Sequence, residues 1–184
     1  MKRCVLCLLI LLSLSGCYKS NNNYLISSIG FDYEDGMYNT AFEAVISNSE
    51  TDEQTVKLIK AKGDTIEKCV KEIEKQCTQE VLLSHCGTIA VGKSVDKERL
   101  QEIYDYCFKN ENITISVRFV KTENAEKLLS QEPVSAVAVG YDILNLTEQT
   151  DKSAKNRYFE IMAQNGKAKM PKVTLTKEGY YFEN

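Results

Sequence analysis

The sequence predicts an α+β fold, in which helices pack on a mixed, largely antiparallel β-sheet. Two β-rich runs flank Asp35-Gly36, and Asp-Gly between two such runs is a strong signal for an antiparallel hairpin. Further along the chain, strand-like and helix-like segments alternate, which favours a sheet with helices packed on it. Hydrophobic residues make up 43% of the chain and charged residues 27%, as is usual for a globular domain.

The first three strands are predicted between residues 24 and 61. Residues 24–31 are rich in β-forming side chains, and a turn at residues 33–36 leads into the second run, residues 37–46. This run alternates, which places five of its side chains on one face: Tyr38, Thr40, Phe42, Ala44 and Ile46. Residues 47–54 are polar and acidic and predict an exposed loop, and residues 55–61 predict a third strand.

The clearest predicted helix begins at Asp64. Asp64 and Glu67 have the spacing of an N-cap residue and its N3 partner. Apolar residues then recur at helical spacing, and charged residues occupy the other positions. The apolar stripe comprises Ile66, Cys69, Val70, Ile73 and Cys77.

The next unit is predicted as strand, helix, strand. Residues 82–91 are mostly apolar and indicate an interior strand, after which either Ser94 or Asp96 caps a helix. That helix carries its own stripe of Leu100, Ile103, Tyr104 and Cys107. Residues 112–120 alternate and predict a strand, with Arg118 outward and Ile113, Ile115, Val117 and Phe119 inward.

The last third of the chain gives weaker patterns. A short helix after Thr122 is expected to bury Ala125, Leu128 and Leu129. Residues 134–146 fit a helix with Val137, Ala138, Tyr141 and Leu144 on its stripe, although their first part also alternates like a strand. Tyr158, Ile161 and Met162 suggest further helical turns, and residues 171–176 predict a terminal strand.

The N-terminus has the layout of an export signal. Lys2 and Arg3 precede an apolar run of eleven residues, 4–14, which is too short to cross a bilayer of about 30 Å as a helix. The following Leu14-Ser15-Gly16-Cys17 resembles a bacterial lipobox. This resemblance implies a lipoprotein whose Cys17 receives a diacylglyceryl group, with palmitate as a typical acyl chain, and becomes the mature N-terminus. The alternatives are an ordinary secretory signal and an uncut anchor.

These features divide the chain into three parts. Residues 1–16 are expected to be the signal peptide, and residues 17–23 the lipidated cysteine and a flexible polar tether. Residues 24–184 are then a single α+β domain. The domain would lie on the extracytoplasmic face of the cell membrane, held there by its lipid.

Four cysteines remain once Cys4, Cys7 and Cys17 are set aside: Cys69, Cys77, Cys86 and Cys107. Outside the cytosol they can form two disulfides in three ways. Cys69 and Cys77 cannot bond to each other, because eight residues of helix place them about 12 Å apart. The favoured interpretation is that all four are small buried apolar residues, since each lies on an apolar run or stripe.

Composition and motifs argue against several classes of function. The net charge of −3 disfavours binding to nucleic acid, which needs clustered Lys and Arg. The GxGxxG fingerprint of dinucleotide sites does not occur, and no nucleotide cofactor is predicted. No metal is predicted either, because the four cysteines of the expected domain contain no CxxC pair and the single histidine cannot complete a Cys₂His₂ zinc site. His85 and Cys86 are adjacent on the predicted strand and would point to opposite faces, which excludes a catalytic dyad. His85 is therefore expected to be a structural side chain where the strand begins.

Two groups of carboxylates are interpreted as structural. Glu72 and Glu74 lie on the solvent side of the first helix, and Asp32, Glu34 and Asp35 surround the predicted turn. A weak Ca²⁺ site at this turn is the alternative. No catalytic residues are predicted, and the protein is not expected to be an enzyme.

Eight segments carry a resemblance to a known family: Gly16-Cys17, Ile29-Gly30-Phe31-Asp32, Asp35-Gly36, residues 61–66, residues 85–92, Arg118-Phe119-Val120, residues 125–129 and Pro171-Lys172-Val173. In this order they resemble the N-terminal domain of the Ger(x)C spore-germination lipoproteins, the C subunits of nutrient germinant receptors. Family members usually have Trp after the lipid-bearing cysteine, where this chain has Tyr18, and they carry further C-terminal domains.

The resemblance implies a non-catalytic role in spore germination. The family's C subunit is held by its lipid on the outer face of the spore inner membrane, beside two polytopic membrane subunits. One of them resembles an amino-acid transporter, and the other forms an ion-conducting channel. The alternative function is a lipid-anchored solute-binding protein, but no set of converging polar groups in an apolar pocket is evident from the sequence, so a small-molecule ligand is not expected.

Overall fold

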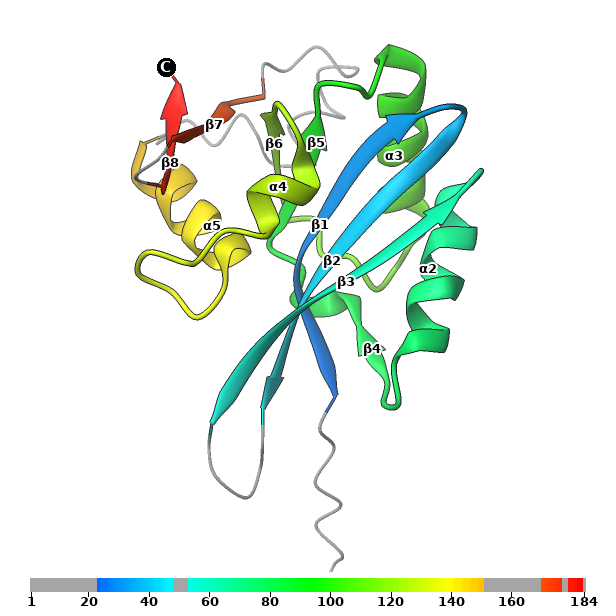
Figure 1. Cartoon of the computed structure of the whole chain (residues 1–184), viewed down its shortest axis with the longest axis horizontal. Helices are drawn as coiled ribbons and strands as arrows, with labels where there is room; N and C mark the ends of the chain where they lie inside the picture. The colour runs from blue at the N-terminus through cyan, green and yellow to red at the C-terminus, as the bar shows by residue number, and fades with distance from the viewer. Residues whose placement is uncertain (1–22, 48–52, 151–169, 177–178, 184) are drawn as a thin grey trace, which may run out of the picture.

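The computed structural model describes residues 23–47, 53–150, 170–176 and 179–183. In these parts of the chain, eight strands form one sheet in the order β3-β2-β1-β5-β6-β7-β8, with β4 also paired to β1 (Figure 1). The strands are β1 (Tyr24–Glu34), β2 (Met37–Ser47), β3 (Gln54–Gly63), β4 (Val81–Leu82), β5 (Thr88–Gly92), β6 (Arg118–Thr122), β7 (Lys172–Thr176) and β8 (Gly179–Glu183).

The predicted α+β class is confirmed, and so is the mixed, largely antiparallel sheet. The antiparallel ladders β1–β2 and β2–β3 each contain ten residue pairs. The parallel ladders are shorter, with four pairs between β1 and β5 and five between β5 and β6. The hairpin turns at Asp35-Gly36, where both residues have positive φ (53° and 77°) as a tight two-residue turn requires.

Helices cover both faces of the sheet. They are α2 (Ile66–Gln76), α3 (Lys97–Lys109), α4 (Ala125–Leu129) and α5 (Val139–Thr150), with a short 3₁₀ turn at Leu83–His85. The larger core joins α2 and α3 to side chains such as Ile29, Phe31 and Phe42. A smaller core joins α4 and α5 to Ala41 and Ala90 on the opposite face. No helix among the described segments is long and apolar enough to span a membrane.

The helix caps agree with the predictions, with one shift. α2 is capped by Thr65, whose hydroxyl accepts from the Lys68 N–H (3.3 Å), and not by Asp64. Asp64 instead forms an ion pair with the Lys68 ammonium (2.6 Å). Asp96, and not Ser94, caps α3, and Asn124 caps α4.

Three predicted segments differ from the structure. Residues 82–91 are not one strand, because the 3₁₀ turn interrupts them before β5. The strand predicted at residues 112–120 starts only at Arg118, since turns precede it, so Ile115 is 71% exposed. Arg118, expected to face outward, is buried and lies 3.8 Å from Glu148 of α5, which covers that face.

The helix predicted within residues 134–146 begins only at Val139, and its buried stripe differs from the predicted one. Val139, Ile143 and Thr147 are buried, whereas Tyr141 and Leu144 are only partly buried. The alternation of small apolar residues before Val139 obscured where the helix starts. The terminal strand is present as β7, and the turns suggested around Tyr158, Ile161 and Met162 lie outside the described residues.

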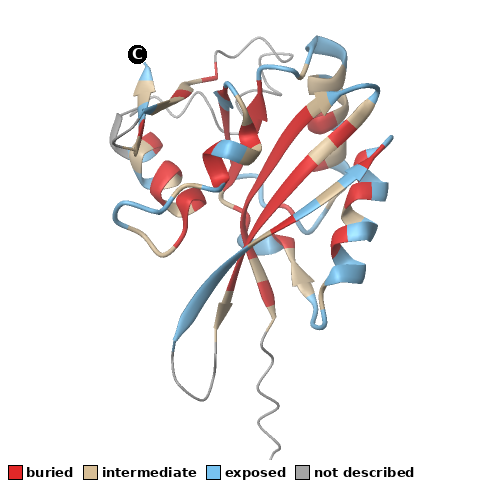
Figure 2. Cartoon of the chain, viewed as in Figure 1, coloured by how far each residue is buried: buried red, intermediate tan, exposed pale blue. Residues whose placement is uncertain are grey.

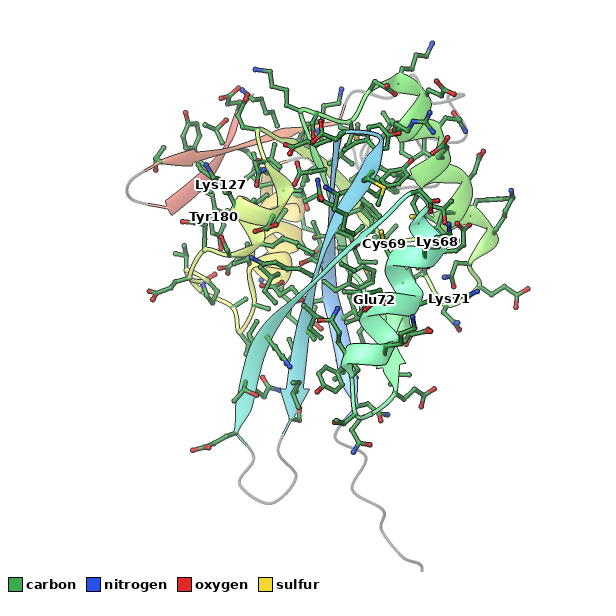
Figure 3. All side chains as sticks on the ribbon, turned by 45° about the vertical axis from the view of Figure 1, so that its right-hand side comes forward. Lys68, Cys69, Lys71, Glu72, Lys127 and Tyr180 are labelled. Carbon is green, nitrogen blue, oxygen red and sulfur yellow. The ribbon has the colours of Figure 1, made fainter. Side chains whose placement is uncertain are left out.

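The stripes of α2 and α3 are confirmed. Figure 3 shows Cys69 on the sheet side of α2, while Lys68, Lys71 and Glu72 point away from the sheet. Ile66, Cys69 and Ile73 are buried on α2, and Ile103, Tyr104 and Cys107 on α3. All four cysteines of the domain are free thiols, and only Cys77 is partly exposed.

Candidate functional site

The end of the sheet where β1 begins is the part of the fold closest along the chain to the predicted lipid site. Tyr24 starts β1 and pairs with Ile46 of β2 and Val81 of β4, and Ile46 pairs in turn with Thr55 of β3. Cys17 lies seven residues before Tyr24 and outside the described residues. The start of β1, the end of β2 and the start of β3 therefore lie side by side (Figure 1).

The β2–β3 hairpin extends beyond the helices at this end. The first four residues of β3, Gln54–Lys57, are all exposed, although alternate side chains point to opposite faces. Neither face of the strand is covered here, as Figure 2 shows by the exposed start of β3. Val56 is an exposed apolar residue on this arm, with 43% of its surface accessible.

Glu43 of β2 is a buried carboxylate that holds the start of α5. A β-bulge interrupts the β1–β2 ladder between Ile26 and Ser28, so that Ser27 and Ser28 both reach Glu43. Their hydroxyls donate to Oε2 of Glu43 at 2.6 and 2.9 Å. The backbone N–H groups of Val139 and Gly140 donate to the same carboxylate at 2.7 and 2.8 Å.

In this arrangement, the negatively charged Glu43 carboxylate accepts hydrogen bonds from the first N–H groups of α5. The N-terminus of a helix carries unpaired N–H groups and a partial positive charge, both of which a carboxylate stabilises. Gly140 allows the close approach, because a Cβ at this position would lie 2.5 Å from the Cβ of Ser28. Glu43 therefore fixes α5 against the sheet.

Asp32 plays the same part for α4. Its carboxylate is buried and accepts from the N–H groups of Ala125 (3.0 Å) and Glu126 (3.1 Å). Burial raises the pKa of Asp32 above 3.8, and these two backbone hydrogen bonds oppose the rise. The prediction that Asp32 serves the turn at Asp35-Gly36 is thus wrong: Asp32 binds the start of a helix far along the chain.

A third buried carboxylate, Asp142 of α5, ties the preceding loop and β8 to the helix. It accepts from the N–H groups of Ser135 (3.1 Å) and Ala136 (2.7 Å) and from the Tyr180 hydroxyl (2.6 Å). Figure 3 shows Tyr180 on the side of the molecule where α5 and β8 lie. Burial raises the pKa of Asp142, but hydrogen bonds from Tyr180, Ser135 and Val134 outweigh this effect and leave the pKa below 3.8.

We expect Asp142→Asn to destabilise the protein by about 2–3 kcal/mol at pH 7, because charged acceptors make the stronger hydrogen bonds. The folded-state pKa of Asp142 is depressed, so its stabilisation is complete above the unfolded pKa of 3.8 and is lost as the pH falls through the folded value. Urea unfolding at pH 7 and pH 3 should show the variant and the native protein converging at the lower pH. The exposed Asp105→Asn is the control, and an equal cost at both positions would contradict the assignment.

A cleft of about 620 Å³ lies between α2 and α3. At the cleft, the Tyr38 hydroxyl donates to Glu102, which pairs with Arg99, whose guanidinium lies over the Tyr33 ring. The hydrogen bond from Tyr38 is the main cause that lowers the pKa of Glu102. The volume suits a small molecule, but most lining side chains are charged, whereas ligand pockets are mainly apolar.

The structure separates His85 from Cys86 by burial, although not for the predicted reason. His85 is exposed on the 3₁₀ turn, and Cys86 is buried in the core. Burial raises the pKa of the Cys86 thiol to about 12, so the thiol is protonated and a poor nucleophile. His85, which was expected to be a structural side chain where the strand begins, lies exposed on the 3₁₀ turn before β5.

The described residues contain no cluster of three or more His, Cys, Asp or Glu side chains that could hold a metal ion. Glu72 and Glu74 lie on the solvent side of α2, as expected. Sequence reasoning missed Glu43 and Asp142 altogether. The adjacent Ser27-Ser28 was the available signal, because two small polar residues inside an apolar strand suit a bulge.

These observations define a three-layer α+β domain whose buried charges hold its helices in place. The family model for the spore germination protein N-terminal domain matches residues 19–175. Because the match covers well over half of the 184 residues, the chain belongs to this family of spore germination proteins. Neither the curated proteins nor the solved structures compared with the chain gave a match.

Proposed function

We propose that this protein is the lipid-anchored, non-catalytic subunit of a nutrient germinant receptor, and that it acts in spore germination by binding protein partners. The observation that carries the proposal is the match to the spore germination family, which begins two residues after Cys17. The partners would be two polytopic membrane subunits, and the location the outer face of the spore inner membrane.

The segment between Cys17 and the first strand is short, which would keep the folded domain close to its lipid anchor. Seven residues lead from Cys17 to Tyr24, which span at most about 25 Å when extended. Each buried CH₂ of an acyl chain contributes about 0.8 kcal/mol, and two chains together give stable anchoring. Holding a folded domain at this distance raises its effective concentration toward membrane partners, so weak contacts suffice for assembly.

Cys17→Ala tests the anchor. We expect the variant to lose at least about 90% of its membrane association and the germination response to nutrient, because without acyl chains the hydrophobic attachment disappears. Fractionation of spore membranes and intact-mass analysis of the purified chain are the measurements. Cys77→Ala, a cysteine within the fold, is the control. Full membrane association and response in Cys17→Ala would contradict the proposal.

A lipid-anchored solute-binding protein is the competing function, and the cleft between α2 and α3 is the feature that favours it. Thermal unfolding of the protein in the presence of nutrient amino acids separates the two functions, since a ligand that binds only the folded state raises the melting temperature. A rise that Glu102→Gln abolishes would favour the solute binder. Unchanged melting, together with co-purification of two polytopic proteins, would favour the receptor subunit.

A further inference from the structure

Among the described residues, the outer edge of β3 is the longer unpaired edge of the sheet. β3 stands last in the strand order, and β2 is its only ladder neighbour among the described residues. An edge strand presents backbone N–H and C=O groups that can pair with another extended segment. The other end of the sheet order, β8, is only five residues long.

α2 covers only half of this edge. The side-chain amide of Gln76, at the end of α2, donates to the backbone carbonyl of Lys60 (3.0 Å). This hydrogen bond occupies an edge acceptor in the second half of β3. The first half, Gln54–Leu58, extends beyond α2, and its first four residues are exposed.

The same hydrogen bond indicates which backbone groups point outward. In an antiparallel ladder, the N–H and C=O groups of alternate residues point toward the partner strand and away from it. Because the Lys60 carbonyl is bound by Gln76 from α2, the groups of Leu58 and Val56, two and four residues earlier, also point away from β2. The segment therefore offers a regular set of outward donors and acceptors.

We propose that the Gln54–Leu58 edge of β3 is a docking site for an extended extracytoplasmic segment of an integral membrane protein, which adds to the sheet as a further strand. The occupant is argued from position. Thr55 lies two strands away from Tyr24, about 10 Å, and the tether limits Tyr24 to about 25 Å from the lipidated Cys17. This edge is thus held close to the membrane surface, where segments of membrane proteins are available for strand addition.

The inference rests on the proposed anchoring at Cys17, and its test keeps the two apart. A photoreactive benzoylphenylalanine is placed at Val56 of the full chain in sporulating cells, and at Tyr181 of β8 as the control. Membrane fractionation first shows that both chains are anchored. We expect adducts from position 56 to map to one extracytoplasmic segment of an integral membrane protein, at least about tenfold more than from position 181.

A pair of variants tests whether the contact is a backbone pairing. Val56→Pro removes an outward N–H and leaves the β2 ladder intact, since proline is tolerated on an edge strand, whereas Val56→Ala keeps the N–H. In chains without the photoreactive residue, we expect Val56→Pro to reduce co-purification of the membrane protein that the adducts identify at least about tenfold, and Val56→Ala less than about threefold. Crosslinks to lipid or to a second copy, or anchored chains without adducts, overturn this proposal alone. Loss of membrane association in the unsubstituted chain overturns the proposed function.

Discussion

Gly92→Ala is expected to destabilise the protein by about 3–5 kcal/mol, because the added methyl group would collide with a buried carboxylate. An alanine at this position would place its Cβ 1.7 Å from Oδ1 of Asp32. The Asp32 carboxylate must then move away from the start of α4. The backbone N–H groups of Ala125 and Glu126 would lose their buried acceptor. Urea unfolding of the purified protein measures the cost.

A double-mutant cycle with Asp32→Ala isolates this cause. Asp32→Ala alone also destabilises the protein, because it removes the acceptor, but it opens the space that the new methyl group needs. In that background Gly92→Ala should cost at least about 2 kcal/mol less than it does in the native protein, since residues in contact show such coupling. Additive effects of the two substitutions would show that Gly92 is required for another reason.

Glu43→Gln is expected to cost about 2–4 kcal/mol and to loosen the start of α5. One carboxylate oxygen accepts from Val139 and the other from Gly140, so an amide in either orientation leaves one helix N–H without an acceptor. The negative charge at the helix N-terminus is lost as well. Urea unfolding and amide hydrogen exchange at Val139 and Gly140 are the measurements.

The matched control for Glu43 is Glu74→Gln on the exposed side of α2. Surface substitutions of this kind usually change stability by less than about 0.5 kcal/mol. Equal losses of stability in Glu43→Gln and Glu74→Gln would show that Glu43 does not hold the helix. Unchanged amide hydrogen exchange at the start of α5 in Glu43→Gln would show the same.

Local patterns were enough to predict most of the elements. The hairpin at Asp35-Gly36, the stripes of α2 and α3 and the short helix α4 each follow from residues close together in the sequence. The predicted pattern was less reliable where several small or apolar residues follow each other. Residues 82–91 and 134–146 contain such runs, and there helix, turn and strand have similar periodicity.

The buried carboxylates could not be predicted, because their partners are distant in sequence. Asp32 binds N–H groups more than ninety residues later in the chain, and so does Glu43. Glu43 stands in an alternating strand, where its face would normally be solvated, and only the packing of α5 buries it. When helices cover both faces of a sheet, a carboxylate on the face expected to meet solvent can instead accept hydrogen bonds from the start of a helix.

The position of β1 has a consequence for how the chain folds. β1 is the first strand made, yet it lies inside the sheet, with β2 on one side and β4 and β5 on the other. The β1–β3 meander can form as soon as residue 63 is available, whereas β5 follows the end of β1 by more than fifty residues. Until β5 is synthesised and pairs with β1, the backbone N–H and C=O groups on that side of β1 have no β5 partner. During this time, pairing with another copy of the chain competes with completion of the domain.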